Sequence, residues 1–399
     1  MGDDAVISRS SFRAALLLAA LACSLPGRAR TPVDPTVLAP FVAHEVAPGV
    51  HLLAEPEDFS GNLSGNVTLI EQRDGVVLVD SGNSIGDGRR VVAYVRSLTD
   101  KPVKAVMITH WHNDHPLGIA AIRAAWPHVR IIATPQTREG LLGPGMLIVG
   151  LRPDPRFDTM AFNRMSAGVA QAQAVIADPA TSDERRQRMT AIIRNLWVSA
   201  HDFEGTYLVP PTETFTDQLL IDDPERPVRL MYLGRANTEG DAIAWLPRQR
   251  IVVTGDIVVS PIPFGFGSYP EDWIRALQRL KALDFALLVP GHGEPMAGAA
   301  YVDRLIGTIR DVRDQVGPLA RQGLSLDEVR GRVDFSAQTA VFGTTPRLRA
   351  LFDIEWLQPM MENAWKEARG IPIIQGQGLL PGGGAVRAPA NNPPRRRRR

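Results

Sequence analysis

The residues most able to do chemistry in this chain lie in one run, from Thr109 to His115. The run places the imidazoles of His110, His112 and His115 and the carboxylate of Asp114 within six consecutive residues. Imidazole nitrogen and carboxylate oxygen are the ligands that zinc and iron prefer. The run therefore predicts a metal site, for which a solvated histidine-rich loop is the alternative.

The segments on either side of this run favour the metal site. Residues 103–108 are mostly apolar and β-branched, as in a buried strand, and residues 116–122 are typical of a turn followed by the start of a helix. Open α/β sheets place their chemistry where strands end. His110 and His112 would share one side of an extended segment, whereas Asp114 and His115 lie past it and could face a second metal.

His-x-His-x-Asp-His after a strand resembles the metallo-β-lactamase superfamily, and three further segments resemble that family's pattern in the same order. An early apolar strand ends at Asp80, and a later one ends at Asp256, the position of the family's metal-bridging carboxylate. The segment Val-Pro-Gly-His-Gly resembles the loop with the family's last histidine, here His292. These matches span about residues 46–292.

One position departs from the family pattern. The family usually has Gly-x-x-His-Thr-x-Gly-Asp, and residues 234–241 here are Gly-Arg-Ala-Asn-Thr-Glu-Gly-Asp. Asn237 therefore stands in the place of a histidine ligand. Its amide oxygen is neutral and a weaker zinc donor than imidazole, so the resemblance implies two zinc sites of which the first is held more weakly, with iron or manganese comparatively better tolerated. His201 is an alternative that could replace the missing imidazole.

The resemblance also implies a role for each candidate residue. Asp114 and Asp256 would take part in catalysis as well as binding metal, and Asp80 would orient a ligand imidazole from outside the metal shell. The implied ligand set is His110, His112 and Asn237 for the first metal, Asp114, His115 and His292 for the second, and Asp256 as the bridge.

The function implied is that of a metal-dependent hydrolase, in which a metal-bound hydroxide attacks an ester, thioester, lactone or lactam bond. Residues 258–266, which follow Asp256, are apolar and aromatic, so we expect a small, partly hydrophobic substrate. One alternative is a metal-binding family member with weak or lost hydrolase activity because of Asn237. A second is a di-iron redox enzyme with a flavin partner, which the intact His115 disfavours. A nuclease is weaker still.

Strands and helices alternate along the chain in two similar halves, within residues 67–109 and 230–289, and this predicts layered α/β packing. With the resemblance, the expectation is an αββα metallo-β-lactamase sandwich over residues 40–298. The motifs fall at strand ends on one edge, so both halves should face a shared groove.

A helical insertion of about residues 140–203 separates the two halves. Apolar residues at helical spacing predict two helices there, interrupted by Pro179. Residues 141–162 are apolar and broken by Gly and Pro, which suits a lid over the groove; the alternative is that they pack on the core. Residues 299–370 should form a helical C-terminal extension, whose last helix covers 345–369.

Residues 1–30 are typical of a secretory signal peptide. Arg9 and Arg13 precede an apolar run, residues 14–22, that is too short for a permanent membrane anchor. We therefore expect an exported protein, periplasmic or secreted, with no transmembrane anchor in the mature chain. Cys23, the only cysteine, could instead carry a lipid anchor. A mature chain without cysteine suits an oxidising compartment.

The composition is that of an ordinary soluble globular protein. The formal net charge of +1 includes five terminal arginines, Arg395 to Arg399, so the rest of the chain is net negative. The body therefore gives no basic signal for nucleic acid, and a small molecule is the expected partner. Residues 376–399, rich in Gly, Pro, Asn and Arg, should be disordered.

Overall fold

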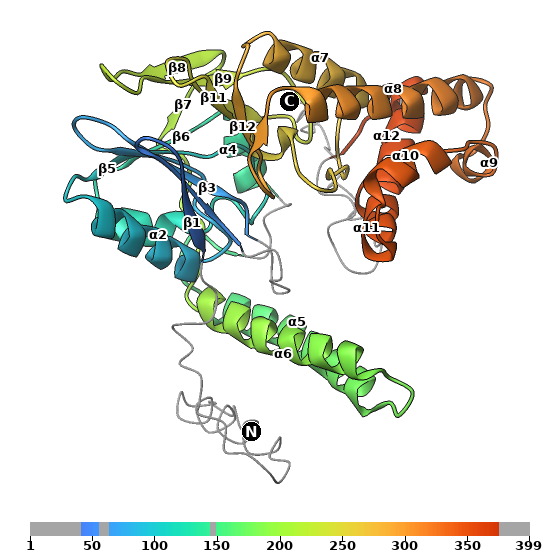
Figure 1. The fold of residues 1–399 in the computed structure, drawn as a ribbon, viewed down its shortest axis with the longest axis horizontal. Coiled ribbons are helices and arrows are strands. Elements are labelled where there is room, and N and C mark those ends of the chain that lie inside the picture. Colours follow the sequence, from blue (N-terminus) through green and yellow to red (C-terminus); the bar gives the residue numbers. More distant parts are fainter. Residues whose placement is uncertain (1–40, 56–63, 144–148, 375–399) are drawn as a thin grey trace, which may run out of the picture. The chain divides into compact units, whose positions relative to one another are not determined.

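The computed structural model describes residues 41–55, 64–143 and 149–374, whose elements are drawn in Figure 1. The predicted signal peptide, Cys23 and the predicted disordered tail lie outside the described residues. Within the described ranges, no helix is both long and apolar enough to cross a membrane.

The first sheet contains seven strands in chain order. β1 to β4 pair antiparallel, whereas β4 to β7 pair parallel. The change follows from the connections, because parallel neighbours need a crossover, here supplied by α2 (Ile85–Leu98) and α3 (Ile119–Ala125). The strands are β1 (Val42–Ala47), β2 (Val50–Ala54), β3 (Val67–Glu71), β4 (Val76–Val79), β5 (Val103–Met107), β6 (Arg130–Ala133) and β7 (Glu213–Thr214).

The second sheet contains six strands in the order β13-β12-β11-β10-β9-β8. All its neighbours are antiparallel except β11 and β12, which are joined by the crossover helix α7 (Pro270–Lys281). The strands are β8 (Gln218–Ile221), β9 (Val228–Tyr232), β10 (Ala242–Leu246), β11 (Ile251–Val253), β12 (Leu287–Val289) and β13 (Met296–Ala297).

Strand β4 shows how the layers are built, because it is apolar and buried along its whole length. Val77 and Val79 belong to the core between the two sheets, where side chains from β9 to β11 meet them. Val76 and Leu78 point to the opposite face and join the core beneath α2 and α3. A third core packs α7 and the C-terminal helices on the second sheet. The predicted αββα sandwich with a helical C-terminal extension is confirmed.

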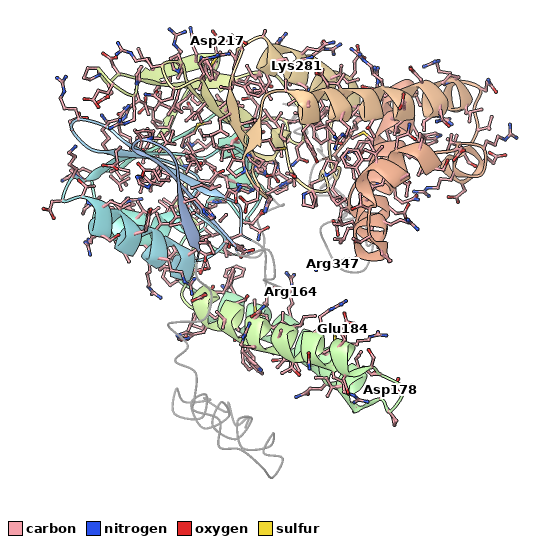
Figure 2. The ribbon with its side chains drawn as sticks, viewed as in Figure 1. Arg164, Asp178, Glu184, Asp217, Lys281 and Arg347 are labelled. Carbon is pink, nitrogen blue, oxygen red and sulfur yellow. The ribbon has the colours of Figure 1, made fainter. Side chains whose placement is uncertain are left out.

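The insertion forms an antiparallel helical hairpin, visible in green in Figure 1. It consists of α5 (Pro155–Ala177) and α6 (Asp183–Phe203), and it follows the short helix α4 (Pro135–Leu142). Charged side chains on the hairpin, among them Arg164, Asp178 and Glu184, are exposed (Figure 2). Charged residues at the solvent face are expected of helices that bury their opposite face.

The predicted break at Pro179 is found, because this proline lies between the two helices of the hairpin. The lid over residues 141–162 stays a prediction. Residues 155–162 are the first turns of α5, and residues 144–148 lie outside the described residues. Asp154 caps α5 by accepting from Arg156 N, and Pro155 opens the helix, so this Pro is a helix start signal.

The C-terminal extension begins with α8 (Ala300–Arg321), α9 (Leu326–Arg330) and α10 (Ser336–Phe342). The single helix predicted over residues 345–369 is instead α11 (Pro346–Leu351), a π-helical segment (Phe352–Leu357) and α12 (Gln358–Ala368).

The π-helical segment has a cause in the sequence. Pro359 has no N–H, so the carbonyl of Glu355, four residues earlier, cannot receive its α-helical hydrogen bond. That carbonyl accepts instead from the backbone N–H of Gly265, 2.9 Å away in the loop that follows β11. A proline in the last helix thus ties the extension to the second sheet.

Candidate metal centre

The predicted metal ligands come from the ends of parallel strand pairs. His110 follows β5, which pairs parallel with β4, and Asp80 follows β4. Asp256 follows β11, and His292 follows the parallel neighbour β12. Because parallel neighbours end at the same edge, each sheet delivers its polar side chains to one place.

The structure brings these side chains together in one buried cluster. Nε2 of His115 lies 3.3 Å from Oδ1 of Asp256 and 3.5 Å from Oδ2 of Asp114. Nε2 of His292 lies 2.9 Å from Oδ2 of Asp114, and Nε2 of His110 lies 3.6 Å from Oδ2 of Asp256. The two sheets therefore contribute to the same site.

Two groups of side chains in this cluster have donor atoms close enough to hold a cation. His110, His115 and Asp256 form one, and Asp114, His115 and His292 form the other, with the donor atoms of each group within 4.8 Å of one another. Nitrogen and carboxylate donors in this mixture suit zinc, iron or manganese.

Unpartnered buried atoms point to the same interpretation. Among the described residues, Nε2 of His110, Nε2 of His115 and Oδ1 of Asp256 are buried without a hydrogen-bond partner. Buried polar atoms are nearly always paired, so three unpaired ones facing each other need a partner that the protein does not supply. A pair of divalent cations meets that need, and the residues present therefore fit the metals that the family resemblance implies.

His112 lies beside this cluster rather than in either group. Its side chain is buried, and its ring centroid is 4.6 Å from that of His110. The ring of His112 also meets the ring of Phe264, whose centroid is 5.6 Å away in an edge-on arrangement. Phe264 and Phe266, 5.2 Å apart, thus place an aromatic surface next to the histidines.

Asn237 is completely buried, and neither its amide nitrogen nor its amide oxygen has a partner among the described residues. Hydrogen bonds hold the loop around Asn237 at two points. The hydroxyls of Thr134 and Thr137 both donate to the carbonyl of Gly240, and Thr238 N donates to Asp241. A fully buried amide on a rigid loop is compatible with ligation through its oxygen. His201, the alternative ligand, lies exposed in the last turn of α6.

Burial and neighbouring charges shift the pKa of Asp256 in the cluster in opposite directions. Burial would raise the pKa of Asp256, but the imidazoles of His115 and His292 hold it well below its usual range. Burial lowers the pKa of His110 well below its ordinary value. The carboxylate is therefore anionic and His110 neutral, which are the forms that bind metal.

Asp80 was predicted to orient a ligand imidazole, and its Oδ2 lies 2.8 Å from Nδ1 of His115. It also accepts hydrogen bonds from the backbone N and the hydroxyl of Thr109. The chain must approach closely on the opposite side of the site as well. A Cβ on Gly291 would lie 2.0 Å from Oδ1 of Asp256, so the residue before His292 has to be glycine.

Asn363 and the residues just before β3 also shape the site, although the sequence did not identify them. The amide of Asn363, in α12, donates to the carbonyl of Gly265 and to the hydroxyl of Ser268. These bonds fix the loop that carries Phe264. Gly65 and Asn66 donate hydrogen bonds to the loops that carry Asp114 and His292. Nothing local in the sequence marks either group, because their partners are distant along the chain.

Comparisons with known proteins agree with the fold. A family model described as the metallo-β-lactamase superfamily matches residues 60–292. A linear primary-alkylsulfatase from Pseudomonas sp. is 28% identical over 300 residues, which cover 71% of this chain and 52% of the relative. This chain thus spans about half the length of that curated relative.

Two solved structures are also similar. The stereoselective inverting sec-alkylsulfatase Pisa1 from Pseudomonas sp. matches with a TM-score of 0.55 and 15% identity, over 85% of this chain and 52% of that one. The metallo-β-lactamase FIM-1 from Pseudomonas aeruginosa matches with a TM-score of 0.46 and 15% identity, over 68% of this chain and 95% of that one.

Proposed function

This chain belongs to the metallo-β-lactamase superfamily, and on that premise we propose that it is a metal-dependent hydrolase acting on an ester bond of a small, partly hydrophobic substrate, with a sulfate ester first among the candidates. The observation that carries the proposal is the buried cluster of unpartnered nitrogen and oxygen atoms on His110, His115 and Asp256. The alkylsulfatase relative supports the choice of ester.

The proposed ligands are those of the predicted set: His110, His112 and Asn237 for one metal, Asp114, His115 and His292 for the other, and Asp256 between them. Divalent cations bound there would supply Lewis acidity to polarise the bond under attack. We propose zinc, with iron or manganese as alternatives at the site that contains Asn237.

The chain's own residues supply orientation and a proton acceptor. The side chain of Asp114 keeps 21% of its surface exposed, so it can accept a hydrogen bond from an attacking water. His115 is held by Asp80 and cannot rotate without breaking that contact. Phe264 and Phe266 offer the apolar part of a substrate a surface beside His112.

A substrate panel tests the proposal. The purified protein, stripped of metal and then reloaded with zinc or manganese, is assayed on a primary alkyl sulfate, a carboxylic ester, a thioester, a lactone and a β-lactam. We expect turnover of the alkyl sulfate that depends on metal and is lost in Asp256→Ala. A protein that holds two metals yet turns over none of the five substrates would contradict the proposed reaction.

One observation favours a second candidate. Asn237 stands where the family pattern usually has histidine, a stronger donor, so a metal-binding protein with weak or lost hydrolase activity is the alternative function. It predicts bound metal without turnover in the same panel. The two candidates therefore separate in one experiment.

We also propose that the protein is exported to the periplasm or secreted, on the pattern of residues 1–30. Mass spectrometry of protein from an export host should show the apolar run 14–22 removed. Intact Met1 in the exported fraction would contradict this, and a lipid-modified Cys23 would favour a lipid anchor instead.

A further inference from the structure

Asn66 lies just before β3 and contacts the loop that carries His292, on the other half of the molecule. Its side-chain nitrogen donates to the carbonyl of Pro290 at 3.0 Å and to the carbonyl of Gly293 at 2.8 Å. Its backbone N–H donates to the carbonyl of Gly291 at 2.7 Å. One residue thus binds three carbonyls that surround His292.

The chemistry of these contacts allows one assignment of the amide. Backbone carbonyls only accept hydrogen bonds, so the NH₂ end of the Asn66 side chain must face them. Asn66 is 6% exposed, so these bonds have little competition from water. An aspartate in its place would be of the same size but would put a carboxylate against two carbonyls.

The residue before Asn66 contacts the other ligand loop. Gly65 N donates to the carbonyl of Asp114 at 2.9 Å. A Cβ on Gly65 would lie 2.4 Å from Cε1 of His115, so the backbone here packs directly against that ring. Two successive residues therefore hold loops from both halves, whose side chains meet where Nε2 of His292 lies 2.9 Å from Oδ2 of Asp114.

On its other side, the His292 loop is held mainly by backbone bonds. Gly291 N donates to the carbonyls of Gly255 and Val258, each at 3.0 Å, and Ser260 N donates to the carbonyl of His292. These bonds relate His292 to Asp256, which comes from the same half. Among the described residues, the His292 loop is related to the opposite half by the two side-chain bonds of Asn66, its backbone bond to Gly291, and the ion pair between His292 and Asp114.

We propose that Asn66 is a positioning residue for the second metal site, and that its amide sets the spacing between His292 and Asp114. The inference rests on the metal site of the proposed function. Asn66 touches neither metal nor substrate. It acts through the loop, so its loss should weaken the site that contains His292 and leave His110 and Asn237 as they are.

The test compares metal binding by the full chain and by three variants. Asn66→Ala and Asn66→Asp both remove the two side-chain donors. Asn363→Ala is the matched control, because Asn363 is also buried and also donates twice, but to Gly265 and Ser268 rather than to the loops that carry His292 and Asp114. Zinc affinity is measured at each site by chelator competition, and amide hydrogen exchange is measured over residues 288–294 in the metal-free proteins.

Supporting partners of metal ligands are typically worth 10–100-fold in affinity, so we expect zinc at one of the two sites to bind roughly tenfold or more weakly in both Asn66 variants. Exchange over residues 288–294 should be faster. The Asn363→Ala variant should lose thermal stability without either change. If either Asn66 variant is too unstable for titration, faster exchange confined to the His292 loop still supports the inference, and exchange raised equally throughout the chain overturns it.

Two further outcomes are distinct. A wild-type protein with two bound metals, and Asn66 variants that bind both with unchanged affinity and unchanged exchange, overturn the role of Asn66 alone. A wild-type protein that binds no metal overturns the proposed function together with this inference.

Discussion

Nδ1 of His115 lies 2.8 Å from Oδ2 of Asp80, and both side chains are almost completely buried. Oδ2 of Asp80 can only accept in this contact when the carboxylate is ionised, so the proton lies on Nδ1 of His115. Nε2 of the same ring is left unpaired and faces Asp256 at 3.3 Å. The aspartate thus selects the tautomer that can bind a cation.

The first prediction follows from this contact. Asp80→Asn should lower zinc affinity about 10–100-fold, because an amide is uncharged and has one acceptor oxygen where the carboxylate accepts from both Thr109 and the ring of His115. Chelator competition measures the change. Asp223→Asn is the control, since Asp223 is also a buried carboxylate that accepts backbone N–H groups, at Arg73 and Arg226, away from the cluster. Equal losses in both variants would mean that the effect is one of stability alone.

The second prediction concerns Asn237, which stands at the position where a histidine ligand is expected. Asn237→His should raise zinc affinity at the first site, because imidazole is the better zinc donor and the loop is already fixed by Thr134 and Thr137. In the wild type we expect dilute chelator to remove one metal well before the other, and in the variant the two steps should approach each other. Calorimetric titration with zinc measures both.

Unchanged zinc affinity in Asn237→His would show that Asn237 is not a ligand. The effect on turnover separates two further cases. A zinc hydrolase handicapped by the asparagine should become faster, whereas a site tuned for another metal should bind zinc more tightly and work more slowly.

The parts of the site that could be predicted from the sequence are those in which the functional residue directly follows the strand that positions it. His110, Asp256 and His292 each follow a short apolar run that ends as a buried strand, so the type of residue and its place at a sheet edge were both visible. The alternation of strands and helices likewise predicted the layers. These signals are local, and the fold follows from them once the two halves pack together.

The remainder depends on contacts between distant residues. Asn66 and Pro290 are 224 positions apart, and Asn363 and Gly265 are 98 apart, so no window of sequence contains both partners. A buried asparagine on its own is indistinguishable from a surface one in the sequence. Pro359 did carry a local signal, because a proline inside a predicted helix leaves a carbonyl without its donor, but what that carbonyl would bind was not encoded nearby.

The third prediction concerns pH. Burial raises the pKa of Asp241 from 3.8 to about 7, with the charge of Asp256 adding to the effect. The folded chain therefore holds this proton more tightly than the unfolded chain. The contribution of protonated Asp241 to the free energy of unfolding is fully present below about pH 4. It is lost as pH rises through about 7. For a shift of this size it amounts to at most about 4 kcal/mol.

Urea unfolding of the metal-free protein between pH 4 and pH 8 measures this contribution. Asp241→Asn mimics the protonated side chain, so the difference in unfolding free energy between wild type and variant should change in the variant's favour as pH rises. Asp223→Asn should show little change over this range, because backbone N–H groups hold the pKa of Asp223 below its usual value of 3.8 and its contribution is lost only as pH falls below that value. A difference that does not vary with pH would contradict the buried, protonated Asp241.

The last prediction concerns the aromatic surface beside the cluster. Phe264 meets the ring of His112, and its loop is fixed to the C-terminal extension through Glu355 and Asn363. If the apolar part of the substrate lies on Phe264, then Phe264→Ala should raise KM for a long alkyl sulfate roughly tenfold, since burying a phenyl ring is worth about 1.5–3 kcal/mol and only part of it would be lost. The effect on a short-chain sulfate should be much smaller.

Asn363→Ala should change KM in the same direction but less, because the loop loses two hydrogen bonds and keeps the Phe264 ring. Steady-state kinetics on two esters that differ only in chain length measure both, and equal losses on the short and long substrates would place the alkyl group elsewhere.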